Sequence, residues 1–371
     1  MFRILFLPLL NIPSGHHHVA DVLVRQLEKS DPGIQCKKVD PLSFSYGKVE
    51  SVVSSVYLYW IHHFPNLYSS LYKFTAVKNS KKAKRFVTYE LLFLTKMKRL
   101  IQEVQPHAVV CTHAFPSYLL SRLKQMALWD GVAINVYTDY FVNSIWGREG
   151  IDYHFVPSIQ MKNYLASRGI SQRQIFITGI PVDPVFHLQT QNKKRGDRRV
   201  VLISGGNMGA GSIRRFIARL RPSGHIQYKI LCGMNETLYQ FIQQLNHPNI
   251  EPLPYIEKKE DMNRLYEDAD AIITKPGGVT ISECLIKNLP IFVYDALPGQ
   301  EEQNLQFLKK EGLVHHLGNW DKAGNPEEDI LRLLKNKKSN LQLKTALYSS
   351  QIELADPHSF IIHHLKKTKK A

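Results

Sequence analysis

A glycine-rich turn within residues 271–283 (AIITKPGGVTISE) carries the most specific chemistry of the chain. A short apolar run ends and a helical pattern begins across Pro276, Gly277, Gly278, Val279 and Thr280. The N–H groups and positive dipole of a helix start attract anions, and glycine lets the backbone approach a phosphate closely. Glu283 follows where its carboxylate could accept hydrogen bonds from a ribose diol. The segment predicts the diphosphate and ribose contacts of a nucleotide-sugar enzyme, although Thr280-x-x-Glu283 is also the pattern of a ligand-free capping box.

A second glycine-rich loop, residues 205–211 (GGNMGAG), follows the apolar run of residues 200–204. Its spacing matches neither the G-x-G-x-x-G dinucleotide motif nor a P-loop, which disfavours NAD and ATP as ligands. We expect Gly205 and Gly206 to let the backbone approach a phosphate or a sugar. A plain tight turn is the alternative.

Three consecutive histidines follow the first apolar run, where a helix is expected to begin. A helix N-terminus favours the neutral form of a histidine, so His16, next to Gly15, is the predicted general base. Asp139 ends a later apolar run and is a second candidate base, a group that orients His16, or a helix cap. No other ligand cluster accompanies the histidines, so we expect no metal and no cofactor.

A polar cluster follows Pro298 and Gly299 in the loop after the apolar run of residues 290–294. Its amide and carboxylate groups, on Gln300, Glu301 and Asn304, suit the recognition of sugar hydroxyls. The alternative is the solvated polar start of a helix.

The region of residues 57–99 combines aromatic, apolar and basic residues, with nine Lys or Arg and one acid between residues 73 and 99. Rings among lipid headgroups and cations beside anionic lipid are typical of a membrane interface. The predicted membrane-binding residues are Trp60, Phe64, Lys81, Lys82, Lys84 and Arg85. RNA binding and a solvated basic face are the alternatives, and the apolar residues among the aromatic ones favour the membrane.

Strand-like and helical segments alternate along both halves of the 371-residue chain, which predicts an α/β protein with parallel sheets covered on both faces. We place an N-terminal domain at residues 1–186 and a polar linker at residues 187–199. A second Rossmann-like domain follows at residues 200–345, and a C-terminal helix at residues 346–371 packs back toward the first domain.

The net charge of +16 implies an anionic partner: nucleic acid, an acidic membrane surface or phosphorylated substrates. The four cysteines are scattered without a C-x-x-C pair, which favours the reducing cytoplasm. No apolar run approaches the length of a transmembrane helix, and the N-terminus fits a first buried strand better than a signal peptide. We therefore expect a cytoplasmic protein that associates peripherally with the inner face of the membrane.

Together these motifs resemble the family of monogalactosyldiacylglycerol synthases and bacterial diacylglycerol glucosyltransferases, which is related to the enzyme that adds N-acetylglucosamine to lipid I. The motifs that carry the resemblance are, in chain order, Ser14-Gly15-His16, Thr138-Asp139-Tyr140, Gly179-Ile180-Pro181-Val182, Ser204-Gly205-Gly206, residues 274–280 with Glu283, and Gly299-Gln300-Glu301 with Asn304. They span most of the chain and are strongest from residue 272 to residue 304.

The resemblance implies a GT-B fold, in which two Rossmann-like domains face a central cleft and the C-terminal domain holds a UDP-sugar. It implies an inverting, metal-independent transfer of a hexose, as UDP-glucose or UDP-galactose, to a lipid such as diacylglycerol. His16 or Asp139 would be the base. The donor-binding residues would be Gly15, Gly205, Gly206, Ile256, Pro276, Gly277, Gly278, Val279, Thr280, Glu283, Gln300, Glu301 and Asn304.

Other functions remain open at this stage. A polyprenyl-linked or soluble acceptor would keep the donor and change the product. A non-catalytic UDP-sugar sensor that binds membranes would lack turnover. An RNA-binding protein would show a steep dependence of affinity on salt, but no recognised RNA-binding motif supports it, so no nucleic-acid partner is expected.

Overall fold

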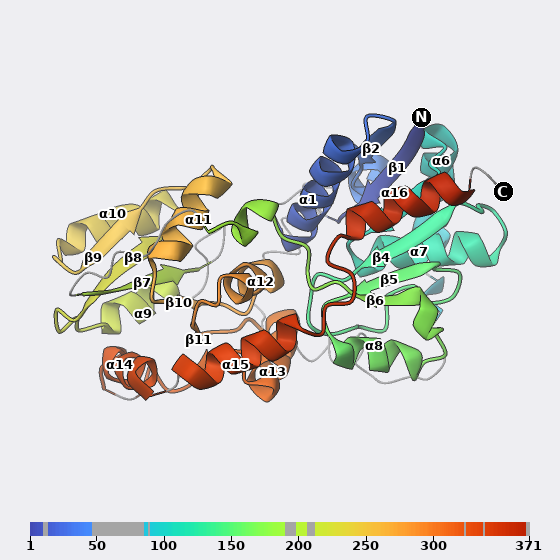
Figure 1. The fold of residues 1–371 in the computed structure, drawn as a ribbon. Helices are drawn as coiled ribbons and strands as arrows, with labels where there is room; N and C mark the ends of the chain where they lie inside the picture. Colours follow the sequence, from blue (N-terminus) through green and yellow to red (C-terminus); the bar gives the residue numbers. More distant parts are fainter. Residues whose placement is uncertain are drawn as a thin grey trace. The chain divides into compact units, whose positions relative to one another are not determined.

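The computed structural model describes residues 1–9, 14–46, 85–87, 90–189, 198–205, 212–322, 324–336 and 338–368. The chain forms two compact units (Figure 1), unit 1 with Met1–Pro181 and Gln351–Ala371, and unit 2 with Val182–Ser350. The predicted boundary after residue 345 falls inside a helix, since α15 runs over Lys338–Ser349. Most of the predicted linker lies outside the described residues.

Unit 1 is built on a six-stranded parallel sheet with the order β2-β1-β3-β4-β5-β6. Its strands are β1 (Phe2–Leu7), β2 (Ile34–Lys38), β3 (Ala108–Cys111), β4 (Val132–Val136), β5 (Tyr153–Val156) and β6 (Ile175–Ile177). Its helices are α1 (Gly15–Ser30), α2 (Pro41–Tyr46), η2 (Glu90–Leu94), α6 (Thr95–Val104), α7 (Ala114–Gln125), α8 (Ile159–Ala166), η3 (Gln172–Gln174) and α16 (Pro357–Thr368).

The central strands of the unit 1 sheet are buried on both faces, as their mostly apolar sequences predict. Leu5 and Leu7 of β1 share a core with α6, α7 and α8, while the alternating Ile4 and Phe6 are also completely buried. Figure 1 shows α1 and α16 on the side of the sheet opposite α7. The α/β class with parallel sheets is therefore confirmed.

The C-terminal helix α16 belongs to unit 1 and completes this second face. Phe360 packs against Phe155 and Phe176, with ring centroids 5.7 and 4.8 Å away. At the end of α16, Lys366 Nζ lies 2.6 Å from a carboxylate oxygen of Asp31, just after α1. Aromatic packing and a terminal ion pair thus hold a segment distant in sequence against the sheet.

Unit 2 contains a second six-stranded parallel sheet, with the order β12-β11-β10-β7-β8-β9. Its strands are β7 (Arg199–Ser204), β8 (Ile226–Leu231), β9 (Ile250–Leu253), β10 (Ala271–Thr274), β11 (Ile291–Val293) and β12 (His315–His316). Its helices are η4 (Pro184–His187), α9 (Ile213–Arg219), α10 (Glu236–Leu245), α11 (Lys259–Asp268), α12 (Gly278–Ile286), α13 (Gln300–Glu311), α14 (Pro326–Asn336) and α15. From β9 to β12 this is the strand order of the dinucleotide-binding Rossmann fold.

The described helices contain no segment that is both long and apolar enough to cross a bilayer. All four cysteines are free thiols, and Cys111, Cys232 and Cys284 are buried in the two units.

A buried carboxylate joins η2 to α7 on the outer side of unit 1. Glu90 is 8% exposed, and its oxygens accept hydrogen bonds from Arg85 at 2.9 Å and from the Tyr118 hydroxyl at 2.7 Å. Arg122 Nε lies 3.0 Å from the same carboxylate. The bonds from Arg85 are the main reason that the pKa of Glu90 is lowered, and burial opposes them.

We expect Glu90→Gln to lower the free energy of unfolding by about 2 to 4 kcal/mol at pH 7, because Arg122 and Arg85 lose their buried counter-charge. A carboxyl with a lowered folded-state pKa stabilises the fold above its unfolded pKa, about 4.3. The difference in the free energy of unfolding between Glu90→Gln and the wild type should therefore shrink as the pH falls below that value. Urea unfolding at pH 7 and at pH 4 measures this difference.

Glu103→Gln is the matched control, because Glu103 pairs with Arg99 on the exposed side of α6. It should change the free energy by about 0.5 kcal/mol or less. Equal losses in the two variants would show that the Glu90 ion pairs contribute no more than a surface pair.

Candidate active site

Unit 1 brings polar residues together where three neighbouring strands end. β1 pairs with β3 and β3 pairs with β4, all in parallel, so their carboxyl ends meet at one edge. His16 lies in the first turn of the helix after β1, Thr112 and His113 follow β3, and Thr138 and Asp139 follow β4. The strand order reverses between β1 and β3, the position where open α/β sheets bind ligands.

The contacts of His16 select its tautomer. Its Nδ1 lies 2.9 Å from the carbonyl oxygen of Thr112 and 2.7 Å from the hydroxyl of Thr138. A carbonyl oxygen only accepts hydrogen bonds, so Nδ1 carries the proton and donates it. In the neutral ring Nε2 then holds a lone pair, which is the arrangement that a general base requires.

Burial is the largest effect on His16, and it lowers the pKa of the imidazole. The negative charge of Asp139 and the hydrogen bond to Thr112 oppose that shift. Burial, and not the helix N-terminus expected from the sequence, is the main cause of the low basicity of His16. Asp139 caps no helix, because the described residues 137–152 contain none, and it acts on His16 through its charge.

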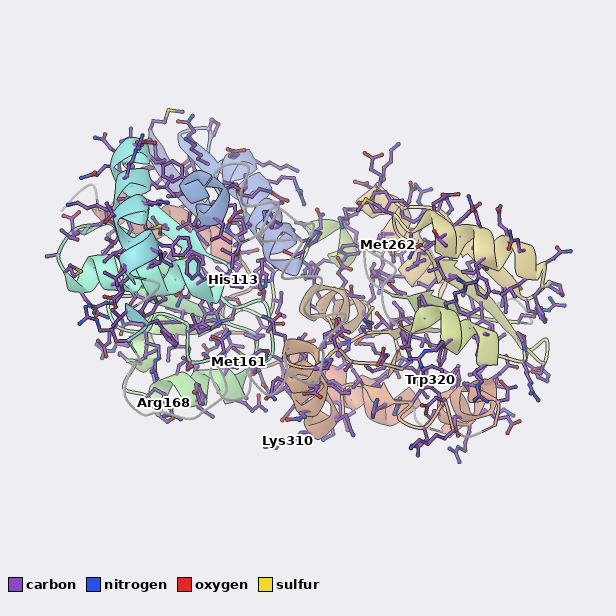
Figure 2. The ribbon with its side chains drawn as sticks, turned by 180° about the vertical axis from the view of Figure 1, so that it is seen from behind. His113, Met161, Arg168, Met262, Lys310 and Trp320 are labelled. Atoms are coloured by element: carbon purple, nitrogen blue, oxygen red, sulfur yellow. The ribbon has the colours of Figure 1, made fainter. Side chains whose placement is uncertain are left out.

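His113 belongs to this cluster and was missed in the sequence analysis. It lies at the start of α7 (Figure 2), and its ring stands edge-on to His16 with centroids 4.7 Å apart. Its Nδ1 accepts a hydrogen bond from the N–H of Phe115 at 3.1 Å, which leaves Nε2 as the protonated nitrogen. Burial and the nearby His16 hold the pKa of His113 well below its ordinary value. His113 directly follows an apolar run, as Asp139 does, and this position could have marked it as a candidate site residue.

In unit 2 the Pro276-Gly277-Gly278 turn leads from β10 into α12, as predicted. Gly277 is the N-cap, and no side chain among the described residues caps the helix. Thr280 therefore lies within the first turn and cannot be the N-cap of a Thr280-x-x-Glu283 capping box. A Cβ atom on Gly277 would meet nothing within 4 Å, so this side of the turn is open.

Glu283 points into unit 2 from α12 and is 6% exposed. Tyr266 of α11 donates a hydrogen bond of 2.9 Å to its carboxylate. Burial raises the pKa of Glu283 to about 7, while the charge of Lys259 and the bond from Tyr266 oppose the shift. Near neutral pH this carboxyl can therefore both donate and accept hydrogen bonds.

The polar residues at the start of α13 support the same turn. Asn304 is 1% exposed and donates a 3.1 Å hydrogen bond to the carbonyl oxygen of Pro276. Glu301 accepts one from the N–H of Leu297 at 2.6 Å and lies 3.9 Å from Lys275 Nζ. Gln300, the first residue of α13, is half-buried. Asn304 thus holds the turn in place, and contact with a sugar remains a prediction for all three residues.

Of the other predicted donor residues, two lie at the same edge of unit 2, one lies in unit 1 and one lies outside the described residues. Gly205 directly follows β7, the strand beside β10, and Ile256 follows β9 and is half-buried. Gly206 lies outside the described residues, as do Trp60, Phe64, Lys81, Lys82 and Lys84 of the predicted membrane-binding set. Gly15 begins α1 and belongs to unit 1. Within the described part of the chain, no group of three or more histidine, cysteine or acidic residues could hold a metal ion.

Comparison with known proteins identifies the class of protein to which this chain belongs. Residues 16–182 match the family model of monogalactosyldiacylglycerol (MGDG) synthase, and residues 200–356 match the glycosyltransferase family 28 C-terminal domain. The solved structure of Acinetobacter baumannii MurG is similar in fold, with a TM-score of 0.64 at 13% identity over 99% of this chain and all of that one. The chain therefore has the GT-B fold of glycosyltransferases.

Two related proteins identify the family of this chain more closely. The uncharacterized glycosyltransferase YkoN of Bacillus subtilis is 48% identical over 93% of this chain and 91% of its own length. A processive diacylglycerol beta-glucosyltransferase of Bacillus cereus is 29% identical over 72% of this chain and 69% of its own. The chain belongs to the family of monogalactosyldiacylglycerol synthases and bacterial diacylglycerol glucosyltransferases.

We expect NMR titration of the histidine ring protons to place the pKa of His16 below 6.5, its ordinary value. Asp139→Asn should lower it further, because the carboxylate charge favours the imidazolium form. His16→Gln assigns the resonance. An unchanged or higher pKa in Asp139→Asn would contradict the electrostatic coupling of the two residues.

Proposed function

We propose that this protein transfers a hexose from a UDP-sugar to a lipid acceptor such as diacylglycerol, with inversion at the anomeric carbon. The observation that carries the proposal is the open, uncapped start of α12 at Gly277, in a chain that belongs to a glycosyltransferase family. UDP-glucose is the preferred donor in this proposal, supported by the name of the Bacillus cereus relative.

The donor site is assigned to unit 2. The N–H groups of Gly278, Val279 and Thr280 and the helix dipole would stabilise the leaving diphosphate without a metal ion. The half-exposed Gly277 lets the diphosphate approach the backbone. Glu283 would bind the ribose, and the buried ammonium of Lys275 adds positive charge beside the turn.

The base is assigned to unit 1. His16 Nε2 would take the proton of the acceptor hydroxyl as the acceptor oxygen bonds to the anomeric carbon. The bond from that carbon to the diphosphate oxygen breaks, and UDP leaves with the electron pair. His113, with a proton on Nε2, would donate a hydrogen bond near the reacting oxygen.

The acceptor and location are supported by relatives and by exposed residues. The Bacillus cereus relative is named for a diacylglycerol acceptor. Beside Arg85, the side chains of Val87, Leu91 and Leu92 are 50%, 78% and 55% exposed. Exposed apolar side chains next to cations suit an anionic membrane surface, so we place the enzyme peripherally at the cytoplasmic face of the membrane.

Gly277→Ala should weaken UDP binding about tenfold or more without changing stability. The added methyl group meets no protein atom within 4 Å, and φ of −75° is ordinary for alanine. It would, however, occupy the space that a diphosphate needs. Isothermal titration with UDP and thermal unfolding are the two measurements.

Gly324→Ala is the matched control, because a Cβ atom there also meets nothing within 4 Å. Its UDP affinity should equal that of the wild type. Unchanged UDP affinity in Gly277→Ala would remove the diphosphate from this turn.

The activity test offers radiolabelled UDP-glucose or UDP-galactose to diacylglycerol in anionic vesicles. We expect glycolipid product with the wild type, more from UDP-glucose, and a loss of about 100-fold or more in His16→Ala at unchanged UDP affinity. His363→Ala, at an exposed histidine, should retain full activity. UDP binding without product from either sugar would contradict the acceptor and favour a soluble acceptor or a sensor.

A further inference from the structure

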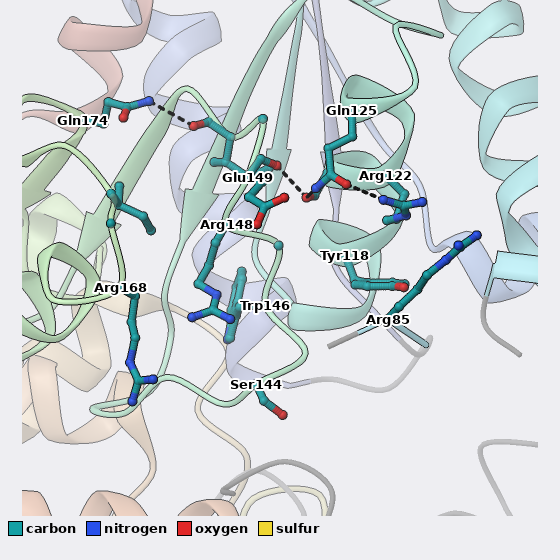
Figure 3. Close-up of a pocket in the computed structure, with 16 residues that line it drawn as sticks. Arg85, Tyr118, Arg122, Gln125, Ser144, Trp146, Arg148, Glu149, Arg168 and Gln174 are labelled. Carbon is teal, nitrogen blue, oxygen red and sulfur yellow. Dashed lines mark hydrogen bonds between the residues drawn. The ribbon is translucent and has the colours of Figure 1, made fainter. Parts of the chain in front are cut away.

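We propose that an arginine-lined pocket in unit 1 binds a phosphate group, at a site separate from the His16 cluster. The pocket has a volume of about 640 Å³ and lies among α7, the loop of residues 144–151 and the segment after α8 (Figure 3). Arg85, Arg122, Arg148 and Arg168 line it. None of the transfer chemistry proposed above uses these residues, so the inference does not depend on the enzyme activity.

The pocket keeps an excess of positive charge. Glu90, which does not line the pocket, forms ion pairs with both Arg85 and Arg122, so one carboxylate neutralises only one of these two positive charges. Arg148 forms no ion pair with a carboxylate of the described residues, and Glu149 is the sole acid lining the pocket. The two carboxylates, Glu90 and Glu149, offset only part of the charge of the four arginines, and guanidinium groups bind phosphate through paired hydrogen bonds.

The loop that carries Arg148 is fixed against α7 rather than loosely attached. Ser117 of α7 donates a 2.8 Å hydrogen bond to the amide oxygen of Asn135, whose amide nitrogen donates one of 2.9 Å to the carbonyl of Gly147. A Cβ atom on Gly147 would come within 2.4 Å of the Ser117 carbonyl oxygen, so only glycine allows this approach. The backbone before Arg148 is therefore set by buried contacts.

The residues on both sides of Arg148 are anchored as well. Trp146 is 7% exposed and packs against Tyr137 in a tilted arrangement, with ring centroids 4.3 Å apart. After Arg148, the carbonyl of Glu149 accepts a 2.6 Å hydrogen bond from Ser121. Arg148 thus projects from a short segment held at both ends, and Figure 3 shows its guanidinium group toward the same side of the pocket as that of Arg168. Such prior ordering reduces the entropic cost of binding an anion.

The phosphate can belong to a lipid headgroup or to a soluble phosphate, and the experiment separates the two. The variant Arg148→Gln/Arg168→Gln removes two charges from the pocket. Arg173→Gln/Lys29→Gln removes two charges from exposed positions of the same unit. Thermal unfolding and circular dichroism establish that each variant is folded before binding is measured on the full chain.

The soluble arm titrates inorganic phosphate and glycerol 3-phosphate by isothermal calorimetry. The membrane arm measures flotation with phosphatidylcholine vesicles with and without phosphatidic acid. We expect the pocket variant to lose about tenfold or more in affinity in at least one arm, and the surface variant to stay within about twofold. Loss in the soluble arm identifies a free phosphate, and loss only with phosphatidic acid vesicles identifies a lipid headgroup.

Equal losses in the two variants would show attraction by net charge alone and would overturn the proposal. Unchanged binding in the pocket variant, in both arms, would overturn it as well. A surviving UDP affinity in the pocket variant would show that the donor site of unit 2 is intact, so the two proposals can fail independently.

Discussion

The burial of both faces of each parallel sheet is the constraint on which the chemistry of this protein depends. The buried parts of strands such as β1 and β10 are mostly apolar, so most of the polar residues near them stand where the strands end. Parallel pairing then brings those ends to one edge, and residues distant in sequence become neighbours there. His16 and Thr138 meet in this way although 122 positions separate them. The same rule places Gly205 beside the Gly277 turn in unit 2, since β7 and β10 are adjacent strands.

This rule also explains what could be predicted from the sequence. The apolar runs marked the strands, and the residues after them marked the candidate site, so the α/β fold and the turn before α12 were correctly predicted. The capping box was not formed because α12 begins at Gly278, which puts Thr280 inside the first turn. Hydrogen bonds between side chains and residues of other helices or strands could not be predicted from the local sequence. The bonds from Tyr266 to Glu283 and from Asn304 to Pro276 depend on helix packing, which no sequence motif specifies.

The amino-acid composition could not show where the positive charges lie in the folded protein. The sequence showed a strong excess of cations and one basic segment, and Arg85 is the predicted membrane-binding residue that the structure describes. In the folded protein some of these cations have a carboxylate partner and others have none among the described residues. Glu90, which looked like an isolated acid in the segment, is a buried counter-ion for Arg85 and Arg122. Arg148 lines the same pocket because Gly147 allows its loop to lie against α7. The pocket is a property of tertiary packing.

His16 shows how opposing effects act on a buried imidazole. Burial alone favours the neutral ring but also weakens its affinity for a proton, and a general base works best when its pKa lies near the operating pH. The charge of Asp139 and the carbonyl of Thr112 restore part of that affinity. The Thr112 carbonyl has a second effect, since it holds the proton on Nδ1 and leaves Nε2 to accept another. His113 is the reverse, because the N–H of Phe115 occupies its Nδ1 and leaves the proton on Nε2. Two imidazoles at one sheet edge thus carry their protons on different ring nitrogens, and a backbone group selects the tautomer of each.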